Sequence, residues 1–232
     1  MQVTLATHPG TPDWPNEDFA AVAPGAAVLL DGCTTVPRTR DTGCRHGVAW
    51  YARTLGSALL GAIAADPAPP LPSALATAVA GIRASHEGQC DLTNPATPAA
   101  TVTAIRVTRG GVDLLALSDS VIVADYEPGP MVITDDHRAA SVSPDAAGQA
   151  RTTTLPLAGL RGIALLSDGA TRITDSYGVL SWPELLAVLR GPGPGELIGR
   201  VRAAEDADPD CTRWPRSKAR DDATAIYWAQ PG

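Results

Sequence analysis

Short apolar segments that end in aspartate are the feature that most constrains this chain. Three of them lead into Asp31, Asp119 and Asp168, and a fourth, residues 223–228, is preceded by Asp221-Asp222. Short apolar runs bounded by turn residues are typical of buried strands, which hold the residue at their end on a rigid scaffold. Aspartates that converge repel one another and lose hydration unless cations lie between them. Oxygen ligands suit hard ions such as Mg²⁺ or Mn²⁺, so the pattern predicts strand ends that meet at a metal site.

The predicted strands come in consecutive groups separated by helices. Strands are expected at residues 3–6, 19–22, 26–30, 100–107, 112–117, 121–125, 131–134, 162–166 and 223–228. Helices are expected at residues 47–64, 73–86, 181–189 and 196–204 and loops at residues 89–98 and 206–220, while residues 141–154 are polar and weakly patterned. Grouped strands favour antiparallel sheets with helices packed outside them, an α+β layered fold, over a doubly wound parallel sheet.

Composition limits the class of protein. The chain has 232 residues, 44% of them hydrophobic, and no internal repeat or linker divides it, so a single domain over residues 1–232 is expected. The net charge of −7 argues against nucleic acid as a partner. The N-terminus lacks the features of a secretory signal, and no apolar stretch reaches the roughly 20 residues of a membrane span. A cytoplasmic location without a membrane partner is expected, and the sequence does not indicate an oligomeric state.

The cysteines and histidines give no recognised metal motif. The chain contains Cys33, Cys44, Cys90 and Cys211, and no pair has the C-x-x-C spacing of a structural zinc site. Three histidines are scattered along the chain without an H-E-x-x-H motif, namely His46, His86 and His137. The cysteines are therefore expected to be reduced and incidental.

The acidic motifs follow one another in a distinctive order. They are Asn16-Glu17-Asp18, Asp31-Gly32, Ser118-Asp119-Ser120, Ser167-Asp168-Gly169 and Asp221-Asp222-Ala223-Thr224. In this order they resemble the signature of the metal-dependent protein phosphatases of the 2C type, the PPM family, over nearly the whole chain. The resemblance implies a four-layer αββα sandwich, in which two antiparallel β-sheets are flanked by helices. It also implies a binuclear Mn²⁺ or Mg²⁺ centre at one edge of the sandwich.

The resemblance also implies a role for each motif residue. Asp31 matches the carboxylate that bridges the two metals, and Gly32 matches a ligand that uses its backbone carbonyl. Asp168 and Asp221 match ligands of the second metal. Asp221 is preferred to its neighbour because it occupies the first place of the D-x-x-T pattern. Asp119 matches a carboxylate that, together with Asp168, holds a third and weaker metal in bacterial members.

The implied mechanism is hydrolysis of a phosphate ester by water. Two close divalent ions lower the pKa of a water molecule, which attacks the phosphorus of a phosphoserine or phosphothreonine without a covalent intermediate. Glu17 and Asp18 match acidic residues that orient this water, and Asp18, Asp31 and Asp168 are the expected catalytic residues. The resemblance thus implies a bacterial serine/threonine phosphatase that acts on a phosphoprotein, opposite a protein kinase.

The sequence departs from the family pattern where the substrate phosphate binds. Many members carry an arginine shortly before the N-x-D motif, whereas His8 is the only candidate cation in that position here. Arg38, Arg40 and Arg45 follow the Asp31 turn and are the other candidates. The turn after Gly32 lacks the usual further glycines, and Val121 stands where the family pattern has arginine.

These departures leave three functional hypotheses. The first is an active phosphoprotein phosphatase, which the retained Asp31, Asp168 and Asp221 favour. The second is a pseudophosphatase that binds a phosphoprotein or another partner with little or no turnover. The third is a phosphatase for a small-molecule phosphate ester, which the sequence does not distinguish from the first.

Overall fold

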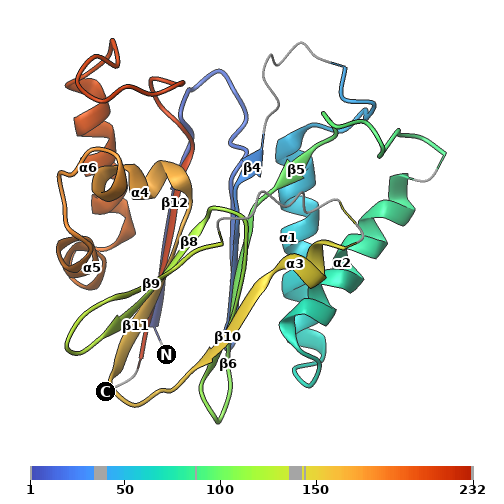
Figure 1. Cartoon of the computed structure of the whole chain (residues 1–232), viewed down its shortest axis with the longest axis horizontal. Coiled ribbons are helices and arrows are strands. Elements are labelled where there is room, and N and C mark those ends of the chain that lie inside the picture. The colour runs from blue at the N-terminus through green and yellow to red at the C-terminus, as the bar shows by residue number, and fades with distance from the viewer. Residues whose placement is uncertain (1, 34–40, 87, 136–142, 144, 231–232) are drawn as a thin grey trace.

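Two five-stranded sheets lie face to face, and helices cover both outer faces (Figure 1). This computed structural model describes residues 2–33, 41–86, 88–135, 143 and 145–230. Every strand pairing in it is antiparallel. The predicted four-layer αββα sandwich is therefore confirmed.

The first sheet joins the two ends of the chain. Its strands, in spatial order, are β1 (Gln2–His8), β12 (Ala223–Ala229), β11 (Leu160–Leu166), β8 (Val121–Tyr126) and β9 (Met131–Ile133). The register places Thr7 of β1 opposite Thr224 of β12. This pairing brings the segment after β1 beside the segment before β12, although more than 200 residues separate them.

The second sheet is built from the middle of the chain. Its spatial order is β10 (Arg151–Leu155), β7 (Val112–Leu117), β6 (Val102–Val107), β3 (Ala26–Leu30) and β2 (Phe19–Ala23). A short ladder, β4 (Gly32–Cys33) with β5 (Ala99–Ala100), continues beyond β3. This ladder holds the residues that follow Asp31.

Each sheet has its own helical cover. The helices α1 (Val48–Ala65) and α2 (Leu71–His86) pack on the second sheet, close to the short α3 (Ala146–Gln149). The helices α4 (Asp168–Asp175), α5 (Trp182–Arg190) and α6 (Pro194–Asp206) pack on the first sheet. Ser181 and Glu184 form the capping box that the sequence predicts at the start of α5.

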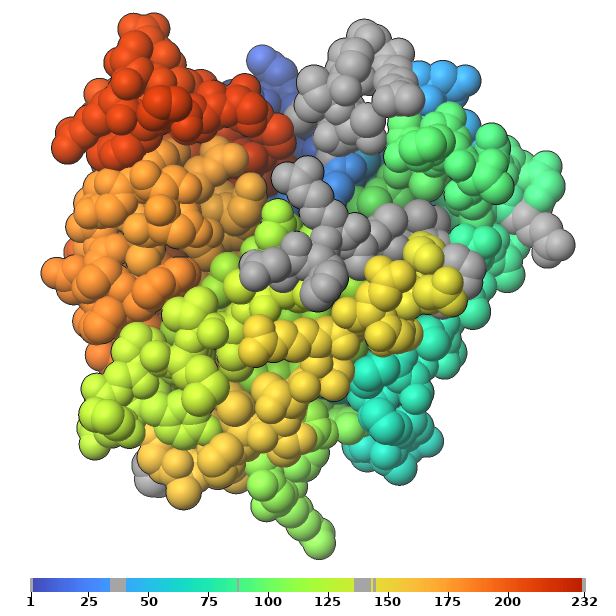
Figure 2. All heavy atoms as spheres, viewed as in Figure 1, coloured from blue at the N-terminus to red at the C-terminus, as the bar shows by residue number. Residues whose placement is uncertain are grey.

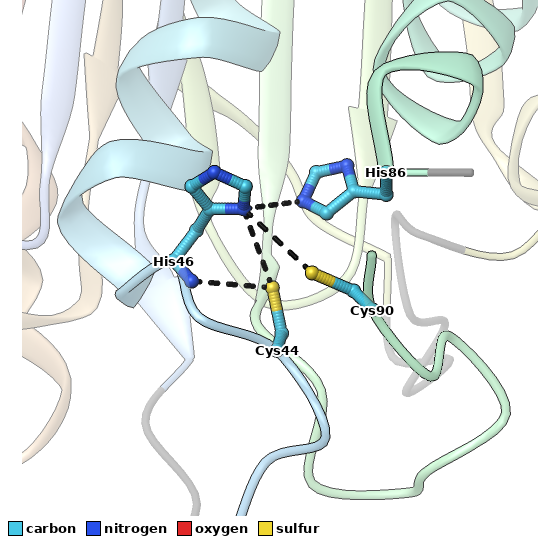
Figure 3. A group of neighbouring side chains, drawn as sticks. All are labelled: Cys44, His46, His86 and Cys90. Atoms are coloured by element: carbon cyan, nitrogen blue, oxygen red, sulfur yellow. Dashed lines mark hydrogen bonds between the residues drawn. The ribbon is translucent and has the colours of Figure 1, made fainter. Parts of the chain in front are cut away.

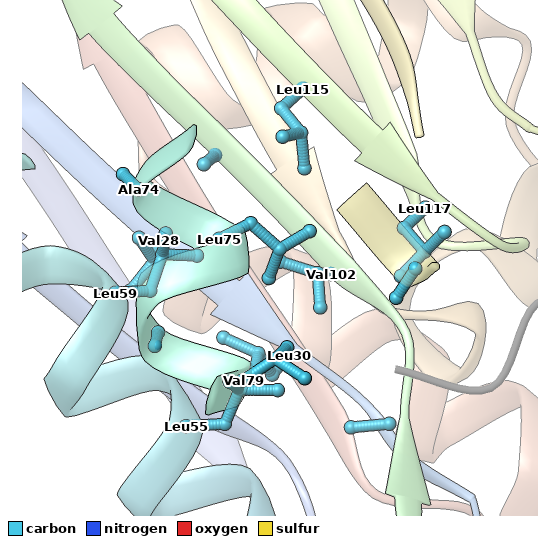
Figure 4. Packing of buried hydrophobic residues seen from close by; sticks show 14 of the residues in the cluster. Val28, Leu30, Leu55, Leu59, Ala74, Leu75, Val79, Val102, Leu115 and Leu117 are labelled. Carbon is cyan, nitrogen blue, oxygen red and sulfur yellow. The ribbon is translucent and has the colours of Figure 1, made fainter. Parts of the chain in front are cut away.

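Strand β3 contributes apolar side chains to two layers of the core. All five of its residues are buried, whereas an antiparallel strand with one side facing solvent would alternate buried and exposed residues. Val28 and Leu30 point toward α1 and α2, as Figure 4 shows. Ala27 and Leu29 point the other way, into the core between the two sheets. Asp31 thus follows a strand that is fixed from both faces.

The helix α1 is long and apolar enough to cross a membrane by length and composition alone. Its residues Tyr51, Leu55 and Leu59 are nevertheless buried against the second sheet and α2. Core helices of soluble proteins pass the same test, so this single helix is weak support for a membrane span.

Two elements were not predicted. Residues 141–154 are polar and weakly patterned in sequence, but the described part of this segment contains α3 and most of β10, which pairs with β7. β10 is an edge strand whose first four residues are exposed, so it carries no apolar alternation that a sequence pattern could detect. The helix α4 was also not predicted, because Asp168-Gly169 resembles a turn after a strand.

Candidate functional site

The predicted aspartates lie at element ends on one edge of the sandwich. Asp31 follows β3, Asp119 follows β7, Asp168 is the first residue of α4 after β11, and Asp221-Asp222 precede β12. Residues at the ends of strands in both sheets therefore lie at this edge.

Hydrogen bonds fix the backbone of Asp31. Its N–H donates to Thr101 Oγ1 at 3.1 Å, and its carbonyl accepts from the Thr101 N–H at 2.8 Å. The hydroxyl of Thr101 lies 2.5 Å from that of Ser120, the neighbour of Asp119. A Cβ at Gly32 would lie 2.5 Å from Val48 Cγ1, so only glycine fits this backbone position.

A second network joins the N-x-D motif to the D-x-x-T motif. The side-chain oxygen of Asn16 accepts from the N–H of Asp18 at 2.9 Å, and its amide group donates to Thr7 Oγ1 at 2.8 Å. Thr7 Oγ1 lies 2.7 Å from Thr224 Oγ1, and the N–H of Thr224 donates to Ser167 Oγ at 2.9 Å. Asp18 and the residue before Asp168 are thus tied to the same pair of strands.

The carboxylate of Asp222 binds backbone N–H groups of the N-terminal segment. Its two carboxylate oxygens accept the backbone N–H groups of Gly10 and Glu17, each at 2.7 Å. Its carbonyl oxygen would lie 1.9 Å from a Cβ at Gly169, which explains why glycine follows Asp168. Asp222 therefore anchors the N-terminal segment and α4.

Two cationic side chains form ion pairs with Asp221. Arg172 Nη2 lies 2.6 Å from its Oδ2, and Lys218 Nζ lies 2.8 Å from its Oδ1. Arg172 also lies 3.7 Å from Asp168, one turn earlier on α4. Lys218 is the only lysine in the sequence. Neither cation was predicted from the sequence, although the i,i+4 spacing of Asp168 and Arg172 was a signal for one of them.

Burial and mutual repulsion disfavour ionisation of the clustered carboxylates. Burial raises the pKa of Asp18 to about 7, with further repulsion from Asp222 and Asp168. Burial, Asp18 and Asp168 raise the pKa of Asp31 well above its usual range. Burial and repulsion from Asp221 also raise the pKa of Asp168. Arg172 lowers this pKa, and Asp119 raises it.

This donor set fits hard divalent cations. The two carboxylate oxygens of Asp18 are buried, and the hydroxyls of Thr224 and Ser167, which lower its pKa, do not offset the effect of burial. Buried carboxylates with raised pKa values are stabilised most directly by a cation held between them. The fit is less complete at Asp221, where a metal would have to replace or share the contacts of Arg172 and Lys218.

The other residues predicted for the site are one acidic residue and four candidate cations for the substrate phosphate. Glu17 is buried, and its carboxylate accepts from Trp14 Nε1 at 3.1 Å. His8 is exposed at the end of β1, with Arg202 Nε at 3.4 Å from its Nδ1. Arg45 lies beside His46, before α1. Arg38 and Arg40 lie outside the described residues.

The structure also gathers four side chains that the sequence left apart. Cys44, His46, His86 and Cys90 lie together near the start of α1 and the end of α2 (Figure 3). These residues form a C-x-H pair followed 40 residues later by an H-x-x-x-C pair, a spacing that differs from both the C-x-x-C and the H-E-x-x-H motifs and was not predicted to bind a metal.

Several solved structures share this fold. Serine/threonine phosphatase Stp1 from Staphylococcus aureus has a TM-score of 0.69 and 14% identity, covering 100% of this chain and 95% of that one. The PPM Ser-Thr phosphatase MsPP from Mycobacterium smegmatis, in complex with cacodylate, has a TM-score of 0.67 and 16% identity, covering 100% of this chain and 99% of that one. The serine/threonine phosphatase PstP/Ppp from Mycobacterium tuberculosis has a TM-score of 0.64 and 17% identity, with coverages of 100% and 99%.

Sequence comparison gives a family but no individual relative. No curated protein matches this chain. Residues 12–192 match the family described as protein phosphatase 2C, a span that includes four of the five acidic motifs. The chain therefore belongs to the protein phosphatase 2C family.

Proposed function

We propose that this chain is an Mn²⁺- or Mg²⁺-dependent phosphatase that hydrolyses phosphoserine and phosphothreonine in proteins. One observation carries the proposal: Asp18, Asp31, Asp168 and Asp221 come from separate segments and lie close enough to act on one another's pKa. Family membership supports phosphate-ester chemistry at such a centre. The proposed enzyme is a bacterial, cytoplasmic, single-domain protein over residues 1–232, acting opposite a protein kinase.

The proposed ligand set follows the strand ends. Asp31 would bridge two ions, and the backbone carbonyl of Gly32 would complete the first site. Asp168 and Asp221 would bind the second ion, and the exposed Asp119 would help Asp168 hold a third. The rigid hydrogen bonds of Asp31 to Thr101 support this assignment, because a bridging ligand must be held in place before the ions bind.

The side chains around the ions would handle the water and its proton. Divalent ions in this position would lower the pKa of a water molecule and neutralise charge on the phosphoryl oxygens. Asp18, held in place by the hydrogen bond from its N–H to Asn16, would orient the attacking water and accept its proton. Glu17, whose N–H is fixed by Asp222, would help orient the attacking water. Water would form the new bond to phosphorus while the serine or threonine oxygen leaves as the alcohol, so no side chain would form a bond to phosphorus.

Lys218 is a further candidate for the cation that binds the substrate phosphate. His8, Arg38, Arg40 and Arg45 remain the candidates proposed from the sequence. Lys218 differs from His8 and Arg45 because its charge acts directly on Asp221, Asp168 and Asp31. Its side chain is 37% exposed, so it can reach a substrate at the mouth of the site.

Hydrolysis assays test the proposed activity. Purified protein is incubated with p-nitrophenyl phosphate and with phosphothreonine peptides, with and without Mn²⁺. We expect hydrolysis that requires Mn²⁺ and that falls by roughly 10²–10³-fold or more in Asp168→Asn. Asp175→Asn, at the exposed end of the same helix, is the matched control and should keep its activity. Metal-independent hydrolysis, or equal rates in both variants, would refute the proposal.

A pseudophosphatase is the second candidate, and one observation favours it. Arg172 and Lys218 already neutralise Asp221, so a divalent ion gains less at this ligand than in a purely acidic site. Calorimetric titration of the protein and of Lys218→Met with Mn²⁺ and with a phosphothreonine peptide separates the two functions. Peptide binding without turnover at saturating Mn²⁺ would favour the pseudophosphatase. Turnover of metabolite esters in place of phosphopeptides would favour a small-molecule phosphatase.

A further inference from the structure

Four metal-ligating side chains meet outside the carboxylate site. Cys44 and His46 precede α1, His86 is the last residue of α2, and Cys90 lies in the loop that follows. One ligand atom from each lies within 4.8 Å of the other three. Figure 3 shows the two rings and the two thiols directed toward a common point. His86 is buried and the other three are half-buried, so solvent has limited access to this point.

The distances match a tetrahedral ion. His46 Nδ1 lies 3.1 Å from His86 Nε2, 3.6 Å from Cys44 Sγ and 3.9 Å from Cys90 Sγ. A tetrahedral Zn²⁺ with bonds of about 2.0–2.1 Å to nitrogen and about 2.3 Å to sulfur separates two nitrogens by about 3.3 Å and a nitrogen from a sulfur by about 3.6 Å. The donor atoms therefore already stand near ligand spacing.

The buried histidine is oriented for binding. His86 Nδ1 lies 2.7 Å from the carbonyl oxygen of Ile82, which can only accept, so Nδ1 carries the proton and donates. The lone pair of Nε2 then points into the cluster. A backbone carbonyl that fixes the ring of a histidine in this way is the usual support of a metal ligand.

The segments that carry the ligands are bound to each other. The N–H of Asp91 donates to the carbonyl of Gly43 at 2.7 Å, and Asn94 Nδ2 donates to the carbonyl of Asp41 at 3.1 Å. Gly43 has a φ of 66°, where glycine is favoured. The N–H of His46 donates to Cys44 Sγ at 3.4 Å. These contacts hold the site together from both segments.

An aromatic wall closes one side of the cluster. The ring of Trp50 stacks on His46 at 4.0 Å with an interplanar angle of 17°. Trp50 also meets the edge of His86 at 5.3 Å. Trp50 therefore restricts both imidazoles and gives the site a fluorescent reporter.

We propose that Cys44, His46, His86 and Cys90 bind one Zn²⁺ ion in a tetrahedral site separate from the carboxylate centre. Thiolate and imidazole ligands select Zn²⁺ over Mg²⁺ or Mn²⁺, which prefer oxygen. Two thiolates and two neutral imidazoles balance the charge of the ion. Four protein ligands leave no open position, so the ion is structural and joins the start of α1 to the end of α2.

Metal analysis and cobalt substitution test the site. The whole chain is expressed with zinc, dialysed against excess Mg²⁺ to occupy oxygen ligands, and analysed by mass spectrometry of its metals. We expect one zinc per chain. Cobalt in place of zinc should give the visible bands of a tetrahedral ion and a thiolate charge-transfer band, which carboxylates cannot produce. Cys90→Ser should weaken zinc binding by more than about 100-fold, whereas Cys211→Ser, a thiol outside the cluster, should not change it.

The zinc affinity can also be measured without a variant, so the test does not depend on whether a variant folds. Competitive titration of the unmodified chain against a chromophoric zinc chelator gives the affinity without any substitution. Zinc absent from the reduced, folded chain would overturn the site. A cobalt spectrum without the thiolate band, or a Cys44–Cys90 disulfide in protein purified under reducing conditions, would do the same.

Discussion

The carboxylate centre and the Cys-His cluster are two potential metal sites of opposite construction. The first draws oxygen donors from the ends of strands in both sheets, whereas the second draws nitrogen and sulfur donors from the ends of two helices on one side. In the space-filling view, residues 206–222 beside the first and residues 88–98 beside the second lie on opposite sides of the same edge (Figure 2). A single chain thus separates hard and soft donors in space.

Different parts of the fold hold the two sites together. The carboxylate centre requires the two sheets to face each other, because Asp18, Asp31 and Asp168 repel one another and are kept together by the whole sandwich. The Cys-His cluster requires only that one loop pairs with another, through Gly43 and Asp91. The first arrangement holds carboxylates whose ionisation is disfavoured in the absence of cations. The second is already near the geometry of a bound ion.

Asp31→Asn should separate the two sites with the largest effect. Removing the proposed bridging charge should lower hydrolysis by roughly 10³-fold or more, while the bound zinc stays at one per chain because Asp31 lies outside the cluster. Rate measurements at saturating Mn²⁺ and metal analysis of the same sample check both halves. Zinc lost together with activity in a folded Asp31→Asn protein would show that the sites depend on each other.

The pH dependence of stability should differ between metal-free and metal-loaded protein. The raised pKa of Asp18, about 7 when folded against an ordinary value of 3.8, means that the folded chain binds more protons than the unfolded chain between these values. Stability without divalent ions should therefore fall as pH rises from about 4 to about 7, by at most about 4 kcal/mol from this group. Denaturant unfolding with EDTA measures the slope.

Two controls sharpen that result. Asp18→Asn removes the titrating group, so the metal-free slope should become shallower. Saturating Mn²⁺ should abolish the slope in the unmodified chain, because the ion favours the charged carboxylates. A metal-free protein whose stability rises with pH over this range would contradict the account of the carboxylates.

Glycine substitutions compare how tightly each site holds its backbone. A Cβ at position 169 would lie 1.9 Å from the carbonyl oxygen of Asp222, so Gly169→Ala should cost about 2–4 kcal/mol. At Gly43 the Cβ would meet Asp91 at 3.0 Å with a φ of 66°, and Gly43→Ala should cost about 1–2 kcal/mol. Gly61→Ala, which points into open space on α1, should stabilise by about 0.5–1 kcal/mol. Unfolding curves that reverse this order would show that the close contacts relax.

Much of the fold could be predicted because its core strands are apolar and periodic. Strands β3 and β7 and helix α1 lie where the sequence places them, within a residue. Strand β10 was missed because Thr152, Thr153 and Thr154 are exposed on an edge and are held by hydrogen bonds to β7. Helix α4 was missed because its buried side rests on tertiary contacts rather than on an apolar repeat.

The candidate site divides in the same way. The aspartates at strand ends could be found, because a strand end is a local feature and their order matches a family. Arg172 and Lys218 could not be assigned to Asp221 from spacing alone, since their contacts depend on how α4 and residues 206–220 fold over β12.

The sequence by itself determined that strands would end in carboxylates and that the order of these motifs along the chain matches the 2C phosphatases. Only the tertiary structure decided that Arg172 contacts Asp221 and that Cys44 and His46 meet His86 and Cys90. The physical reason is distance along the chain. An apolar run that ends in aspartate is encoded by neighbouring residues, whereas contacts across 40 residues are fixed only when helices pack and loops pair.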